Sequence, residues 1–359
     1  MENQIIDDKT VMNQNSSQDS NNQIKAKKKF DWVEFGRNHL FELIALGAFV
    51  FLLILFSFLP QVMTGRSFAR VGFWRPSNLR SYVDRVMIYM ILAIGATFVY
   101  SMGTMDISVG YQVGIMATVF ILVANATGSL ILGIIVALLI GVLSAIFNAF
   151  VGAYVKLPTV MSSVILMQFF RGLLTRYFED DKSRDQKAII LDKQFNIDWA
   201  TSTSFRVVSL IILAAIGVYV LGYTKLGKRA RAIGANKRAA DLAGAQFLKT
   251  RLIAYIVFGG FLVVSAFMLV SNSNGYDGAS SANYQMDIMI MLLMGGMPLS
   301  GGMKTKLTNA ILGTLTYALL SNGFILCGVS ANYIFFVNAL IFITIVVLTC
   351  RKTGEVLPR

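Results

Sequence analysis

One carboxylate stands inside an apolar part of the sequence. Asp106 lies in the segment MGTMDISVGYQ, with Ser108 beside it and Gly103 and Gly110 on either side. An ionisable side chain within a membrane span is costly, so it is a candidate functional residue by default. The glycines around this polar core predict a broken helix, whose freed backbone groups must face protein or a water-filled path. The alternative is that Asp106 only caps the helix that follows it.

A second break is expected in the other half of the chain, in the segment GGMPLSGG. Its residues that disfavour a regular helix are Gly295, Gly296, Pro298, Gly301 and Gly302. Paired interruptions in two halves of a membrane protein indicate a transporter built from repeats, with its path between them. The glycine spacing is also that of a phosphate-binding loop, but Gly302 stands where lysine is required, so we reject nucleotide binding there.

Other polar side chains within the apolar runs are few. Gln168 and Arg171 lie in MQFFRGLLTRYF, and Asn322 is a single amide in a later run. A lone amide in a span more often joins helices by hydrogen bonds than binds a ligand. The candidate residues for a translocation path or gate are Asp106, Ser108, Gly110, Gln168, Arg171, Gly295, Gly296, Ser300, Gly301 and Asn322.

Bond-breaking chemistry is not indicated. The only histidine is His39, and the two cysteines, Cys327 and Cys350, lie far from it in the sequence, within or at the end of apolar runs. These residues form no zinc-ligand pattern and no disulfide framework. We therefore expect neither an enzyme nor a bound cofactor.

Composition places the chain in the membrane. Hydrophobic residues make up 55% of the chain and charged residues 14%, and the mean hydropathy is +0.64. Several apolar runs reach about 20 residues, the length that crosses a bilayer as a helix. The fold class expected is all-α, because lipid offers backbone groups no other partner. The net charge of +13 lies in loops beside the spans, so it indicates orientation in the bilayer rather than nucleic-acid binding.

Ten transmembrane helices are expected, with broken helices near the midplane. Their approximate bounds are 39–59, 82–102, 111–126, 130–149, 156–177, 205–223, 252–270, 286–297, 307–326 and 333–350. An even count puts both termini on one side. Residues 1–36 then form a disordered polar and basic cytoplasmic tail, residues 37–352 the transmembrane domain, and residues 353–359 a cytoplasmic C-terminal tail.

The strongest orientation signal is the segment 221–251. It has eight lysines and arginines against one acid, Asp241, and a cationic loop of this kind stays on the cytoplasmic side. Within it, Asn236 can cap a short helix over 237–243 that Gly244 ends. One loop opposes this orientation, because the five arginines of residues 61–85 then lie outside.

Four stretches in order resemble one family. They are LAIGATFVYSMGTMDISVG (92–110), LPTVMSSVILMQFFRGL (157–173), TKLGKRARAIGANKRAADLAG (224–244), and MLLMGGMPLSGG (291–302) with LSNGFILCGVSANY (320–333). From about residue 40 to 350 the chain resembles the permease subunits of ribose/xylose-type ABC sugar importers, which are relatives of the branched-chain amino acid permeases. Asp106, Ser108 and Gly110 match that family's Asp-Leu-Ser-Val-Gly motif.

The resemblance implies a permease of the type II ABC importer kind, importing a monosaccharide across the bacterial cytoplasmic membrane. A separate cytoplasmic ATPase would dock on a coupling loop at 224–251, an extracytoplasmic sugar-binding protein would meet the loops 178–203 and 272–283, and a second permease subunit would complete a homodimer or a heterodimer. The implied coupling residues are Gly234, Ala235, Asn236, Lys237, Arg238, Ala239, Ala240, Asp241, Leu242, Ala243 and Gly244.

The sequence departs from the family in four places. Lys237-Arg238 stands where the family often has an acidic or neutral pair, and Met297-Pro298 replaces Thr-Ser. The N-terminal tail is longer than is typical, and the resemblance does not explain the arginine-rich loop at 61–85. Other substrates within the family, such as a nucleoside, a polyol or a furanose signal molecule, stay open. An ion-coupled secondary transporter using Asp106 and, less favoured, a membrane enzyme are the alternatives of other classes.

Overall fold

The computed structural model describes residues 40–65, 72–155, 157–178, 188–195, 197–298 and 300–353. The predictions for the N-terminal tail, for most of the C-terminal tail and for the middle of the 61–85 loop lie outside these residues. The chain divides into a unit of residues 1–43 and a unit of residues 44–359, and apart from the first residues of α3 the features below belong to the second unit.

Helices account for most of the described chain, and its two strands have only two residues each, so the all-α expectation is confirmed. They are α3 (Leu40–Thr64), α5 (Pro76–Tyr100), α6 (Val109–Thr127), α7 (Leu130–Tyr154), α8 (Thr159–Phe178), α9 (Asp198–Thr201), α10 (Thr203–Tyr223), α11 (Lys225–Ala235), α12 (Lys237–Leu242), α13 (Phe247–Ser273), α14 (Tyr284–Met294), α15 (Leu307–Leu326) and α16 (Ala331–Thr353).

Seven of the described helices are long and apolar enough to cross a membrane: α3, α5, α6, α7, α10, α13 and α15. Helix α14 is apolar but has only 11 residues. Helix α8 has 20 residues but is less apolar, because it contains Gln168, Arg171 and Arg176. Helix α16 has 23 residues, and its sequence is mainly apolar from Tyr333 to Cys350. The multi-pass membrane architecture is thereby confirmed, and the count of ten spans stays a prediction.

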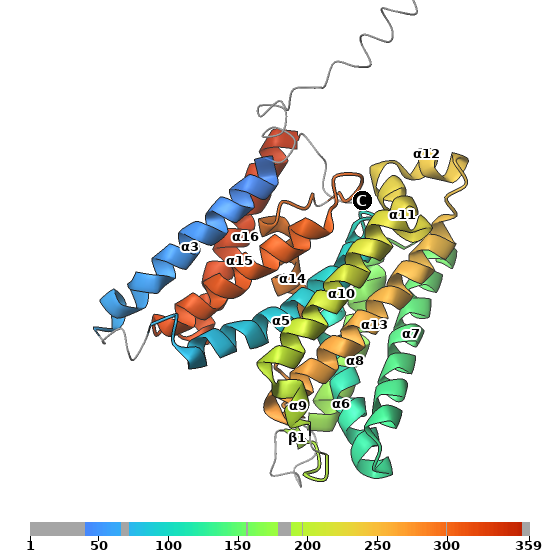
Figure 1. Ribbon diagram of the computed structural model, residues 1–359. Coiled ribbons are helices and arrows are strands. Elements are labelled where there is room, and N and C mark those ends of the chain that lie inside the picture. The colour runs from blue at the N-terminus through green and yellow to red at the C-terminus, as the bar shows by residue number, and fades with distance from the viewer. Residues whose placement is uncertain are drawn as a thin grey trace, which may run out of the picture. The chain divides into compact units, whose positions relative to one another are not determined.

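Helix α5 is the centre of the packing. Every residue from Val86 to Tyr100 is buried, which requires neighbours on all sides of the helix. Those neighbours include α13, α15, α10 and α14, and α13 packs in turn against α6 and α7 (Figure 1). At the crossing of α7 and α13, a Cβ on Gly141 would lie 3.3 Å from the Gly259 carbonyl oxygen, so small residues let the two backbones approach.

Two loops that the sequence places on the outer side are joined to each other. Strand β1 (Ile189–Ile190) pairs antiparallel with β2 (Gly275–Tyr276). The Asn125 side chain fixes this pair, donating to the Ile190 carbonyl at 2.9 Å and accepting from the Asp192 N–H at 3.0 Å. Figure 1 shows β1 and α9 at one end of the helices and α11 and α12 at the opposite end.

Asp277 follows β2 in the same loop. Partial burial acts to raise the pKa of this carboxyl group, but hydrogen bonds from the hydroxyl and N–H of Ser280 and from the N–H of Ala279 outweigh it. The pKa of Asp277 therefore lies below its ordinary value, and the loop carries a stable negative charge.

Three boundaries differ from the sequence expectation. Pro60 lies inside α3 instead of after it, and the Gln61 side-chain amide donates to the Ser57 carbonyl at 2.9 Å, close to the ladder bond that the proline removes. Helix α5 begins at Pro76, the favoured first position for proline, so Arg80 and Arg85 lie in the helix instead of in a loop. Residues 225–235, expected as loop, form α11.

Candidate functional site

The first predicted helix break is confirmed. Helix α5 ends at Tyr100, α6 begins at Val109, and Asp106 in the irregular segment between them is completely buried. One carboxylate oxygen of Asp106 accepts the Ser108 N–H at 2.8 Å and also the Ser108 hydroxyl. The other oxygen accepts the side-chain amides of Gln112 at 3.4 Å and Asn148 at 3.3 Å.

Ser108 is the N-cap residue of α6, and its side chain makes no capping hydrogen bond. Asp106 accepts the N–H of Ser108 rather than an N–H of the helix itself, so a capping role for Asp106 stays a prediction. The carboxylate orders the residues just before α6 and is closed off from any open space in this conformation. A buried charge of this kind needs such donors, because desolvation without them costs several kcal/mol. A role for Asp106 in a path or gate stays a prediction.

A buried arginine completes the cluster, and the sequence analysis missed it. Arg251 was counted with the basic loop, yet it is 2% exposed in the first turns of α13. Its guanidinium donates to the Asn148 carbonyl at 2.8 Å and lies 5.7 Å from the ring of Tyr255. The sequence feature that could have identified Arg251 is its position directly before an apolar run. A basic residue at such a position can be either the last residue of the loop or a buried residue at the start of the helix.

The two helix breaks touch each other. The N–H of Gly302 donates to the Ser101 carbonyl at 2.8 Å. A Cβ on Gly103 would lie 2.6 Å from the carbonyl oxygen of Ser300, and one on Gly301 would lie 2.5 Å from that of Tyr100. All three glycines have positive φ, from +70° to +92°, which other residues adopt only with strain. The sequence predicted two breaks, and the structure brings them into backbone contact.

The end of α11 meets the same point. A Cβ on Gly234 would lie 2.1 Å from the Ser101 carbonyl oxygen and 2.6 Å from the Gly302 nitrogen. We call Gly103, Gly234, Gly301 and Gly302 the glycine junction. It places the basic segment in direct backbone contact with both breaks, across three distant parts of the sequence.

The short helix predicted after Gly234 is present as α12. The Asn236 side chain accepts the Ala239 N–H at 3.1 Å, and Gly244 has a φ of +80° just after the helix. Leu242 is 92% exposed, whereas Ala240 is 5% exposed and faces the protein. Helix α12 is thus exposed to solvent on one face and packs against the protein through Ala240.

The other predicted path residues lie away from the junction. Gln168 and Arg171 are exposed on α8, whose Ser163 accepts the Ile107 N–H at 3.2 Å. Gly110 packs against the Ser281 carbonyl and Asn322 is buried in α15. Gly295 and Gly296 follow the end of α14, where a Cβ on Gly295 would lie 1.8 Å from the Asn309 carbonyl oxygen. The junction therefore gathers only part of the predicted set.

A second buried carboxylate was missed. Asp287, in the first turn of α14, is 7% exposed and accepts the hydroxyls of Tyr89 at 3.1 Å and of Tyr317. Asn338 donates to the Tyr317 hydroxyl at 2.8 Å, so the cluster joins α14, α5, α15 and α16. The signal was the same as for Asp106, namely a carboxylate within an expected span.

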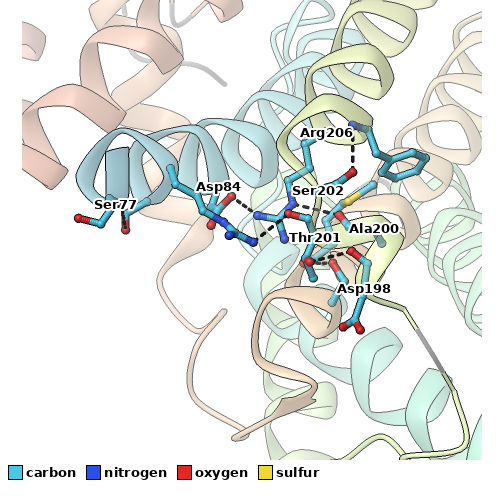
Figure 2. A network of polar contacts seen from close by, with 12 residues as sticks. Ser77, Asp84, Asp198, Ala200, Thr201, Ser202 and Arg206 are labelled. Carbon is cyan, nitrogen blue, oxygen red and sulfur yellow. Dashed lines mark hydrogen bonds and ion pairs between the residues drawn. The ribbon is translucent and has the colours of Figure 1, made fainter. Parts of the chain in front are cut away.

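The arginines at the β1 end have protein partners. Figure 2 shows Arg206 of α10 paired with Asp84 of α5 and donating to the Ala200 carbonyl, at 3.0 Å. Arg80 donates to the Thr201 carbonyl at 3.3 Å, and Arg85 to the Ser321 hydroxyl at 3.0 Å. These contacts give the arginine-rich region a structural role in joining the first turns of α5 to its neighbours.

Comparison with known proteins covers most of the chain. The sequence model of the family described as "Branched-chain amino acid transport system / permease component" matches residues 78–346. The ribose import permease protein RbsC of Bacillus subtilis is 28% identical over 286 residues, 79% of this chain and 88% of the relative. RbsC of Escherichia coli K12 is 23% identical over 285 residues, 78% of this chain and 88% of the relative.

The L-arabinose transport system permease protein AraH of Escherichia coli K12 is 27% identical over 274 residues, which cover 75% of this chain and 81% of the relative. No solved structure matches the chain. The family match includes both breaks, the glycine junction and α12. The chain therefore belongs to the family of permease components of branched-chain amino acid-type transport systems and is a multi-pass transport subunit of the cell membrane.

Proposed function

We propose that this chain is the permease subunit of an ATP-driven ABC importer that moves a monosaccharide of the ribose or xylose kind across the cytoplasmic membrane. The observation that carries the proposal is the glycine junction, which connects an exposed short helix to both helix breaks. The relatives are named as ribose and L-arabinose permeases, which supports the substrate class.

The junction gives a route from partner to path. An ATPase that binds α12 moves the end of α11, because α12 follows α11 after a single residue, Asn236. Gly234 then moves with α11 and presses on Ser101, which lies in the first break, and on Gly302, which lies in the second. Backbone atoms in contact cannot rotate away as side chains do, so displacement of α12 reaches both breaks together.

Three partners follow from this proposal. The ATPase docks on the exposed face of α12, with both chain termini on the same, cytoplasmic side. A sugar-binding protein meets the paired outer loops at β1 and β2. A second permease subunit, identical or paralogous, packs against α8. The exposed Gln168 and Arg171 of α8 are costly in contact with lipid, so we expect the second subunit to cover them and a water-filled path to lie between the two subunits.

The test is Leu242→Glu, because Leu242 is exposed and its substitution disturbs no packing. The matched control is Val155→Glu, since Val155 is 56% exposed at the end of α7 and lies outside α12. We expect Leu242→Glu to lose both copurification of an ATPase from the native membrane and ribose uptake. Its gel-filtration profile and thermal unfolding should match those of Val155→Glu.

Equal uptake by the two variants would contradict docking on α12. Uptake by the purified chain in proteoliposomes without ATP would favour the ion-coupled alternative. Competition of labelled ribose uptake by xylose, a nucleoside and a polyol would then separate the substrates within the family.

A further inference from the structure

Helix α10 is a candidate membrane span with a largely exposed surface. Its buried residues are Arg206, Gly217 and Leu221, so its exposed apolar side is the face expected to lie against lipid. The outward row is apolar and exposed, and includes Val208, Ile211, Ile212 and Ile216. At 21 residues, α10 is about 30 Å long, the thickness of a bilayer hydrocarbon core.

Aromatic side chains mark both ends of this lipid face. Tyr219 and Tyr223, 63% and 73% exposed, stack with ring centroids 6.1 Å apart in the last turns of α10. Trp199 is 50% exposed just before the other end. Tyrosine and tryptophan collect at the level of lipid headgroups, so Tyr219 and Tyr223 place that level at the end of α10.

Helix α11 starts two residues beyond Tyr223 and presents a basic face. Its buried residues are Gly227, Ala230 and Ile233, which lie on one side of the helix. Lys225, Lys228 and Arg229 lie on the exposed side. Within the described part of the chain, these three cations form no ion pair. A fourth cation of this helix, Arg231, is used internally, donating to the Leu221 carbonyl at 3.1 Å.

We propose that Lys225, Lys228 and Arg229 form a binding site for the phosphate headgroups of anionic phospholipids, with Tyr219 and Tyr223 lying against the acyl chains. The stacked tyrosines fix the depth of the site, and the three unpaired cations supply charge at that depth. A patch aimed at a protein partner would not need to follow so directly on a lipid-facing, aromatic-bounded helix end. The site is separate from the exposed face of α12 and needs no ATPase.

The experiment uses the purified full chain without an ATPase. It is extracted in mild detergent and exchanged into nanodiscs made of phosphatidylcholine and the anionic lipid phosphatidylglycerol. Retained phosphatidylglycerol is measured by native mass spectrometry after stepwise removal of free lipid. The test variant is Lys225→Gln/Lys228→Gln/Arg229→Gln, and the control is Lys237→Gln/Arg238→Gln on α12, which removes neighbouring charge outside the site.

We expect the triple variant to retain at least about tenfold less phosphatidylglycerol than wild type, with the control unchanged. Inorganic phosphate at millimolar concentration should leave lipid retention intact, and displacement by it would assign the site to free phosphate. Equal retention by the triple variant and wild type would overturn the proposal. In a separate purification from the native membrane, a triple variant that retained phosphatidylglycerol but lost ATPase copurification would assign the basic face to the protein partner and overturn the proposal.

Discussion

The glycine junction predicts a large effect for Gly234→Ala. The added Cβ would lie 2.1 Å from the Ser101 carbonyl oxygen, whereas real Cβ atoms essentially never approach within 3.0 Å, so the junction must open by about 0.9 Å. Overpacking of this kind costs about 1–3 kcal/mol, and the upper end applies because both neighbours are backbone.

Two further effects adjust that figure. Opening the junction strains the 2.8 Å hydrogen bond from Gly302 to Ser101, which adds about 1 kcal/mol. Alanine in place of glycine in α11 returns about 1 kcal/mol of helix propensity. The net cost to this conformation is about 3 kcal/mol, or about a hundredfold change in its population relative to any state in which the junction is open.

The control is Gly222→Ala, because Gly222 lies in the last turns of α10 with no atom within 4 Å of an added Cβ. It gains the propensity without the clash. We expect Gly234→Ala to unfold several degrees below Gly222→Ala in the same detergent and to lose uptake in proteoliposomes. Matching unfolding temperatures and uptake rates for the two variants would refute the reasoning.

Three more substitutions test the polar clusters by thermal or denaturant unfolding. Asp106→Ala leaves buried donors without an acceptor and should cost about 2–4 kcal/mol. Asp106→Asn keeps one acceptor and should cost less than half as much, so equal losses would mean that these hydrogen bonds do not stabilise the fold. Asp287→Leu leaves two buried tyrosine hydroxyls without an acceptor and should cost about 2–4 kcal/mol, whereas Asp287→Asn should cost much less. A leucine variant as stable as wild type would contradict a stabilising role for this cluster. Arg206→Met should cost about 1–2 kcal/mol of unfolding free energy. The double variant Arg206→Met/Asp84→Asn should cost less than the sum of the two single variants, and costs that simply add would mean that the two side chains are not coupled.

Most helices could be predicted from sequence patterns that span only a few residues. The bounds of α15 match the predicted span at both ends, and α12 begins after the predicted cap, because Asn236 and Gly244 act through hydrogen bonds and φ angles within a few residues. Helix α11 was missed although Ala230 and Ile233 carry a helical spacing, since the density of positive charge was interpreted as loop. That spacing was enough to predict the helix.

The site depended on contacts that local patterns do not contain. Nothing near Arg251 in the sequence says that its guanidinium binds the Asn148 carbonyl of another helix, and nothing near Gly234 says that it lies against Ser101. Asp287 is different, because its burial in a span was available from the same rule that identified Asp106. The sequence can thus identify costly residues in a membrane, but their partners are fixed by tertiary packing.

The glycine junction and the polar clusters have different roles in the fold. The clusters around Asp106 and Asp287 are hydrogen-bonded side chains that fix one arrangement of helices, and their donors can follow small shifts by changing rotamer. At Gly234 no side chain intervenes, so movement of α11 must displace Ser101 and Gly302 or break the bond between them. A contact transmits motion only if its atoms cannot move aside, as side chains do when they change rotamer. Transport should therefore be more sensitive to one methyl group at Gly234 than to the loss of a hydrogen bond at Asp106, even where the two changes cost similar stability.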